Sequence, residues 1–149
     1  MNEEVKLHIY SADITTELDL PYVDGGIKAG FPSPAQDYIT ESIDLNKILI
    51  RNPETTFYAK VSGDSMSDMG ISDGDLVIVD KALEALNGDL VAAFLDKEFT
   101  LKQFKLDKAK RCAWLIPANP KYEPIKVTEE NEFLIWGVVT SCIKQFRKF

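Results

Sequence analysis

Hydrophobic and polar residues alternate in short runs from residue 56 onward, a pattern typical of β-strands separated by turns. The strands that it predicts span 56–61, 76–79, 89–95, 98–106, 113–116 and 133–143. Turn residues follow these runs at 72–74, at Asn87-Gly88 and over 117–124, and Asn-Gly is a common hairpin turn. The sequence therefore predicts a mainly β domain of strongly bent antiparallel sheets.

Two short helices are predicted before these strands. Ser33-Pro34-Ala35-Gln36 combines a cap residue, a proline at the first helical position and a glutamine three residues after the cap. A second short helical segment is predicted to follow Asp44.

The charge of residues 1–29 differs from that of the remaining chain. This segment holds six acidic and two basic residues, a net charge of -4, whereas the other 120 residues hold eighteen acidic and fifteen basic residues, a net charge of -3. Gly25, Gly26 and Gly30 lie close together and leave many backbone conformations to be lost on ordering. We expect a mobile or loosely docked arm, followed by one domain over 30–149.

The total charge of the chain limits its partners. A net charge of -7 argues against direct binding to nucleic acid, which requires a concentration of lysine and arginine, so protein partners are expected. The start of the chain has no basic region followed by an apolar run, and nowhere are 18 consecutive residues apolar. We expect a cytoplasmic protein without a membrane anchor. Cys112 and Cys142 form no Cys-x-x-Cys pair and are expected to be reduced and buried.

Ser65, within the segment 62–66, and Lys102, 37 residues downstream on a predicted strand, are the candidates for chemistry. A serine hydroxyl needs a base to become a nucleophile, and the sole histidine is His8. A lysine, with a reference pKa of ~10.4, serves as a base only when burial favours its neutral form. Taken alone, a turn serine and a solvated lysine are commoner. Alternation does not separate Lys102 from Lys105.

Three motifs in order resemble those of the self-cleaving LexA group of serine peptidases, peptidase S24. They are Ser-Gly-Asp-Ser-Met at 62–66, Gly-Ile-Ser-Asp-Gly-Asp at 70–75 and Glu-Phe-Thr-Leu-Lys at 98–102. The likeness covers roughly residues 29–149 and is greatest for the UmuD type, because Gly-Phe-Pro-Ser-Pro-Ala at 30–35 precedes the core and no DNA-binding domain does. The resemblance implies a LexA/signal-peptidase-like fold.

The resemblance also implies a mechanism and a role in SOS mutagenesis. Lys102 would take the proton of Ser65 as the hydroxyl attacks a peptide carbonyl, and the backbone N–H groups of Ser65 and Asp64 would stabilise the oxyanion. The bond cut would be Ala29-Gly30 of the chain itself. RecA filaments on single-stranded DNA would stimulate the cleavage, and the product would join a UmuC-type translesion polymerase subunit as a homodimer.

Three other functions are alternatives, and the residues argue against the second and the third. In a non-enzymatic β module that binds partner proteins, Ser65 and Lys102 would be structural or surface residues. A LexA-like repressor fragment would need a basic helix-turn-helix, for which residues 1–29 are too few and too acidic. A signal peptidase would share the Ser/Lys dyad but would require a membrane anchor.

The remaining clusters predict no cofactor or metal. The aspartates at 64, 68, 73 and 75 do not have the spacing of a calcium loop, and turn or surface roles are expected for them. The basic C-terminal end is expected to be solvated. Trp114 and Trp136 are expected to fill the core or a subunit interface.

Overall fold

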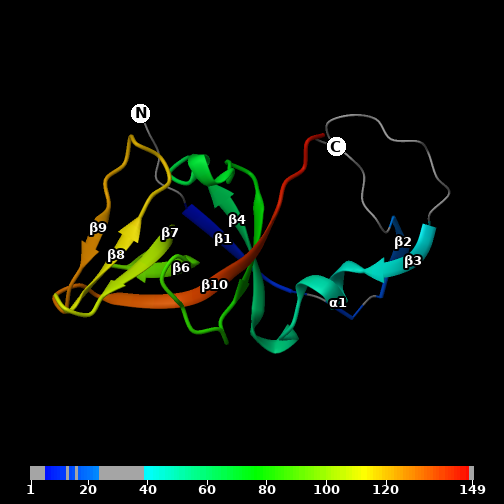
Figure 1. Ribbon diagram of the computed structural model, residues 1–149, viewed down its shortest axis with the longest axis horizontal. Helices are drawn as coiled ribbons and strands as arrows, with labels where there is room; N and C mark the ends of the chain where they lie inside the picture. Colours follow the sequence, from blue (N-terminus) through cyan, green and yellow to red (C-terminus); the bar gives the residue numbers. More distant parts are fainter. Residues whose placement is uncertain (1–5, 13, 16, 24–38, 148–149) are drawn as a thin grey trace.

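The computed structural model describes residues 6–12, 14–15, 17–23 and 39–147, and about half of this part of the chain is β-strand (Figure 1). The main sheet contains β1 (Lys6–Ser11), β4 (Thr56–Ser62), β5 (Leu76–Asp80), β6 (Leu90–Leu95), β7 (Glu98–Asp107), β8 (Cys112–Ile116), β9 (Ile125–Val127) and β10 (Phe133–Ile143). The mainly β class predicted from the sequence is confirmed.

The order of the strands in this sheet is β1-β4-β5-β10-β6-β7-β8-β9, and every neighbouring pair is antiparallel. A separate two-stranded ribbon consists of β2 (Asp19–Val23) and β3 (Ile39–Asp44). In Figure 1 this ribbon lies at one end of the molecule, beyond the short helix α1 (Leu45–Leu49).

Strand β10 is the longest strand and joins the two halves of the sheet. Its residues 133–138 pair with β6 and its residues 138–143 pair with β5, and the register shifts once in each part. We call the point where β10 passes from β6 to β5 the β10 crossing. There, a Cβ atom on Gly137 would lie 2.5 Å from Val79 Cγ1 and 3.1 Å from the carbonyl oxygen of Asp80. Gly137 therefore permits a close approach of β10 to β5 that a side chain would obstruct.

Two clusters of buried apolar side chains form the core, and β6 contributes to both because its residues alternate between the faces of the sheet. The first cluster contains Ala59, Val61, Met66, Ile71, Val77, Val79, Ala92 and Leu101. The second contains Val91, Ala93, Phe104, Ala113, Leu115, Val127 and Val138. Since Met66 follows Ser65 and Leu101 precedes Lys102, packing of the first cluster holds the two candidate residues in the same region.

The helix predicted after Asp44 is confirmed as α1. The Asp44 side chain accepts a hydrogen bond from the backbone N–H of Asn46 at 3.0 Å, as expected for a cap. The helix predicted at 33–36 lies outside the described residues. Two short 3-10 helices, Pro53–Thr55 and Ser67–Met69, complete the described helical structure, and none of these helices is long and apolar enough to cross a membrane.

All six predicted strands are confirmed as β4 to β8 and β10, with ends that agree within one residue. Strands β1, β2, β3 and β9 were not predicted. Two of them, β1 and β2, lie in the segment expected to be a mobile or loosely docked arm, and each pairs with another strand. In β1, Leu7 and Ile9 pack against the first cluster while His8 and Tyr10 are exposed. Inward and outward residues alternate regularly in β1, but the run is too short to be recognised as a strand from the sequence alone.

The hairpin predicted at Asn87-Gly88 is wrong, although a turn occurs there. The strands on either side, β5 and β6, are not neighbours, because β10 lies between them. Residues Asp96 and Lys97 form the tight hairpin turn between β6 and β7, with φ angles of 47° and 72°. Positive φ at both central positions is the geometry of a type I′ turn, here without glycine.

The two cysteines differ in burial. Cys112 is buried, as expected, whereas Cys142 near the end of β10 is exposed, so the expected burial of Cys142 is wrong. Its Sγ atom lies 3.7 Å from Asp75 Oδ2. Trp136 packs in the manner expected, with its ring 5.2 Å from that of Phe57 and 5.8 Å from that of Phe99.

Candidate active site

Ser65 lies in the loop that follows β4, and the conformation of that loop depends on Gly63. Gly63 has a φ of 99°, which L residues with side chains rarely adopt. Its N–H donates to Asp73 Oδ1 at 2.9 Å. Asp73, for which a turn or surface role was expected, thus stabilises this loop. The loop turns Ser65 into the protein, where the residue is fully buried.

Lys102 lies on β7 and is also fully buried, with a relative exposure of 0%. It pairs with Val91 of β6, whereas Lys105, three residues farther along the same strand, is exposed. The difference in burial along β7 thus distinguishes two lysines that alternation along the sequence does not separate. Lys102 Nζ donates to Ser65 Oγ at 3.1 Å and to Thr100 Oγ1 at 2.6 Å.

This contact is the one that a serine and a lysine base require. Burial disfavours the charged ammonium form of a lysine, because transfer from water to a low-dielectric interior costs more for the ion than for the amine. With a neutral Lys102, the contact would reverse, and the Ser65 hydroxyl would donate its hydrogen bond to the nitrogen lone pair. The structure brings the two predicted residues together, and their catalytic roles stay predictions.

A second segment, the loop 117–124 between β8 and β9, holds the loop that carries Ser65. The N–H of Ala118 donates to the carbonyl of Ser65 at 2.8 Å. Asn119 Nδ2 donates to the carbonyl of Asp64 at 2.9 Å, and the Tyr122 hydroxyl donates to Asp64 Oδ1 at 2.6 Å. The sequence predicts only a turn here. No local pattern could have indicated contacts between residues 55 and 58 positions apart.

The other predicted site residues are only partly described. The Asp64 and Ser65 peptide groups lie in the loop held by these contacts, and their role as oxyanion donors stays a prediction. Ala29 and Gly30 lie outside the described residues. In chain order, the predicted bond falls between β2 and β3, which pair with each other.

The described residues include one group of three carboxylates, Glu17, Asp19 and Asp44, whose oxygen atoms lie within 4.8 Å of one another. Asp44 caps α1, and Glu17 forms an ion pair with Lys47. These contacts account for two of the three acids, and exposed acidic groups are common on protein surfaces. We therefore assign the group no metal.

Asp75, one of the aspartates near the candidate site, is bound within the loop. Its Oδ2 accepts hydrogen bonds from Lys144 Nζ at 2.6 Å and from the N–H of Ser72 at 2.8 Å. Burial raises the pKa of Asp75, but these two hydrogen bonds and the Lys144 charge outweigh it, so the pKa lies below its ordinary value. This carboxylate stabilises the turn before β5, in agreement with the expected turn role.

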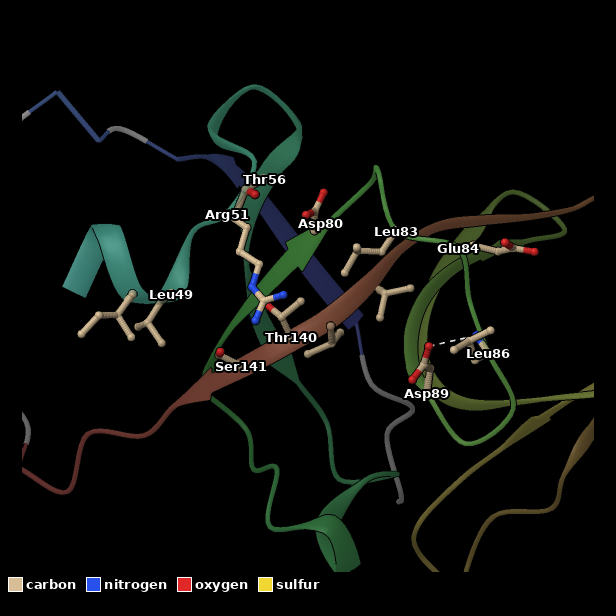
Figure 2. Close-up of a pocket in the computed structure, with 13 residues that line it drawn as sticks. Leu49, Arg51, Thr56, Asp80, Leu83, Glu84, Leu86, Asp89, Thr140 and Ser141 are labelled. Carbon is tan, nitrogen blue, oxygen red and sulfur yellow. Dashed lines mark hydrogen bonds between the residues drawn. The ribbon is translucent and has the colours of Figure 1, made fainter. Parts of the chain in front are cut away.

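A hollow of about 470 Å³ lies between α1 and the C-terminal half of β10 (Figure 2). Leu83 and Leu86 border it, and Figure 2 shows the Arg51 side chain extending toward β10 near Thr140. Neither Ser65 nor Lys102 lines this hollow. It is therefore separate from the candidate active site.

Comparisons with known proteins place the chain in a family. Residues 21–140 match the family described as peptidase S24-like. The chain is 49% identical over 119 residues to protein SamA of Salmonella typhimurium strain LT2, covering 80% of this chain and 81% of SamA. It is 40% identical over 125 residues to protein MucA of Escherichia coli, covering 83% of this chain and 84% of MucA.

A repressor is also similar. The LexA repressor of Ectopseudomonas mendocina strain ymp is 39% identical over 127 residues, which are 85% of this chain and 60% of the repressor. The family match and the three relatives each cover most of this chain. The chain belongs to the peptidase S24-like family.

Proposed function

We propose that the chain is an SOS-response serine peptidase that cleaves its own Ala29-Gly30 bond, with Ser65 as nucleophile and Lys102 as general base. The observation that carries the proposal is the 3.1 Å contact between Lys102 Nζ and Ser65 Oγ, both on fully buried residues. Membership of a peptidase family supports it. A surface serine and a solvated lysine would not be expected to be buried in contact with each other.

The reaction has two stages. Neutral Lys102 accepts the Ser65 proton as Oγ attacks the carbonyl carbon of Ala29, and the negative charge on the carbonyl oxygen is stabilised by the N–H groups of Ser65 and Asp64. The protonated lysine then gives its proton to the departing nitrogen of Gly30, which leaves Ala29 as an ester of Ser65. Lys102, neutral again, deprotonates a water that hydrolyses this ester and restores the serine.

The buried position of Ser65 favours a substrate in the same chain. A peptide must displace protein atoms to reach Oγ, because the residue has an exposure of 0%. A tethered segment has a high effective concentration and can offset the cost of that displacement, whereas a foreign peptide in dilute solution does not have this advantage. On this proposal, residues 1–29 are the segment removed and residues 30–149 form the peptidase domain.

The partners in this proposal are proteins. The product acts as a homodimer with a UmuC-type translesion polymerase subunit in the cytoplasm. A RecA filament on single-stranded DNA stimulates cleavage by favouring the conformation in which the scissile segment reaches Ser65, and it adds no catalytic group. The net charge of -7 supports protein partners over direct binding to nucleic acid.

The test is intact mass of the purified chain after incubation from neutral pH to about pH 10, near the lysine reference value. Ser65→Ala and Lys102→Ala are each compared with a matched control, Ser67→Ala in the same loop and Lys105→Ala on the same strand, since both control residues are exposed. We expect a fragment that begins at Gly30, formed faster as pH rises, in the wild type and both controls only.

Two results would contradict the proposal. Cleavage of Lys102→Ala at the wild-type rate would remove the lysine from the mechanism. A wild-type chain that stays intact, even with RecA, nucleotide and single-stranded DNA, would favour the non-enzymatic β module that binds partner proteins.

A further inference from the structure

The loop 117–124 contacts the Ser65 loop through backbone and side-chain atoms together. Besides the Asn119, Tyr122 and Ala118 contacts, the N–H of Asp68 donates to the carbonyl of Ala118 at 2.6 Å. The Ser65 loop is therefore held both before and after the serine by one neighbouring segment. None of these contacts involves Lys102.

The bond from Asn119 determines more than the position of the loop. The carbonyl of Asp64 and the N–H of Ser65 belong to one planar peptide group and point in opposite directions, since the peptide is trans. Asn119 Nδ2 binds the carbonyl oxygen at 2.9 Å. Holding this oxygen fixes the plane of the peptide and so the direction in which the Ser65 N–H points.

Asn119 is itself fixed before it contacts Asp64. Its Oδ1 accepts a hydrogen bond from the N–H of Lys121 at 3.0 Å, and its carbonyl accepts one from the N–H of Tyr122 at 3.1 Å. Because Oδ1 is used inside the loop, the amide nitrogen is directed at Asp64. The residue is 9% exposed, so water competes little for this bond.

Tyr122 holds the same residue by its side chain. Its hydroxyl donates to Asp64 Oδ1 at 2.6 Å, the short distance typical of a bond to a charged acceptor. The two contacts restrain Asp64 at its carbonyl and at its carboxylate, which limits rotation of the residue that precedes the nucleophile.

We propose that Asn119 and Tyr122 are positioning residues that orient the Ser65 N–H toward the oxyanion of the reaction. The inference rests on the proposed self-cleavage and adds to it a structural origin for the oxyanion donor. Neither residue touches the reacting atoms, and both act through Asp64.

The experiment measures the rate of self-cleavage against pH for two variants. Asn119→Asp keeps the acceptor used by the Lys121 N–H and removes the donor to Asp64, while Tyr122→Phe removes only the hydroxyl. Loss of a whole oxyanion donor costs about 100-fold to 1000-fold in rate, so a misdirected donor is expected to lower the maximal rate about 10-fold to 100-fold in Asn119→Asp. Loss of one restraining hydrogen bond predicts about 2-fold to 10-fold in Tyr122→Phe.

The pH profile separates positioning from other effects. The pH midpoint should stay unchanged in Tyr122→Phe, because the hydroxyl of Tyr122 donates to Asp64, whereas the amine of Lys102 binds Ser65 and Thr100. If the carboxylate introduced by Asn119→Asp acted on Lys102, it would instead move the midpoint upward and leave the maximal rate in place, and that result would overturn the inference. Lys121→Ala, which alters an exposed side chain of the same loop, should cleave as the wild type does. Thermal unfolding of each variant shows whether it is folded during the assay.

Three further outcomes decide the question. Folded variants that both cleave at the wild-type rate, beside an inactive Ser65→Ala, would overturn the positioning role and leave the proposed function intact. A fall in rate that only follows the unfolded fraction would overturn it as well. If the folded wild type forms no fragment under any condition, the proposed function fails and this inference fails with it.

Discussion

Gly137→Ala is the perturbation whose effect follows most directly from the structure. The added Cβ would lie 2.5 Å from Val79 Cγ1 and 3.1 Å from the carbonyl oxygen of Asp80. Val79 is fully buried, so its side chain cannot turn into solvent, and the Asp80 carbonyl is part of the backbone. Such overpacking costs about 1–3 kcal/mol of unfolding free energy. For a chain of this size, 1 kcal/mol shifts the midpoint by about 2–4 °C, which predicts a fall of about 2–12 °C.

The assay is thermal unfolding followed by near-ultraviolet circular dichroism, with a double-mutant cycle to locate the clash. Val79→Ala removes two buried methyl groups and should cost roughly 1.5–3 kcal/mol alone. Together with Gly137→Ala it should cost less than the sum by about 1 kcal/mol or more, because the nearest contact is gone. Additive effects, or an unchanged midpoint in Gly137→Ala, would refute the account of the β10 crossing.

The same substitution is expected to slow self-cleavage. Ser65 follows β4 in the half of the sheet that contains β5, and Lys102 lies in the half that contains β6 and β7. Strand β10 joins these halves, so a displaced crossing changes the distance between the serine and the lysine.

Three other predictions concern stability and reactivity. Burial raises the pKa of Asp80, but hydrogen bonds from two side chains and one N–H outweigh it, so the pKa lies below its ordinary value. The ionised Asp80 therefore stabilises the folded state above the unfolded pKa of ~3.9, and this stabilisation is lost as pH falls through the folded pKa. In urea unfolding, Asp80→Ala should cost about 2–4 kcal/mol of unfolding free energy at pH 7 and less at pH 2. Met66→Ala should cost about 2–5 kcal/mol, whereas Met66→Leu should cost less than about 1.5 kcal/mol; equal costs would exclude a cavity effect. Burial and the Asp75 carboxylate raise the pKa of the Cys142 thiol, so Asp75→Asn should speed its alkylation at pH 8, and an unchanged rate would contradict this cause.

Local patterns were sufficient for much of the fold. The strands β4 to β8 and β10 are runs of apolar or β-branched residues bounded by turns, which is the information that a single segment carries. By contrast, the insertion of β10 between β5 and β6 depends on pairing between distant segments. Strands β1 and β9 have too few apolar residues to be recognised until their partners are known.

The candidate site shows the same division. The motif at 98–102 selects Lys102 over Lys105, but the burial of Lys102 and its contact with Ser65 depend on packing between distant segments. The contacts of Asn119 and Tyr122 are even less accessible to sequence reasoning. They join a turn to a residue more than fifty positions earlier, and neither segment has a periodic pattern.

Strand β1 gives the proposed cleavage an unusual outcome. It precedes the predicted bond in the chain, yet it pairs with β4 at six positions, and Leu7 and Ile9 contact the first cluster. After a cut between β2 and β3, the two polypeptides would therefore stay associated in one folded structure. The shorter fragment would dissociate only after the hydrogen bonds and side-chain contacts between β1 and β4 break. Chemistry would set the time of the cut, and the strength of strand pairing would set the lifetime of the nicked state.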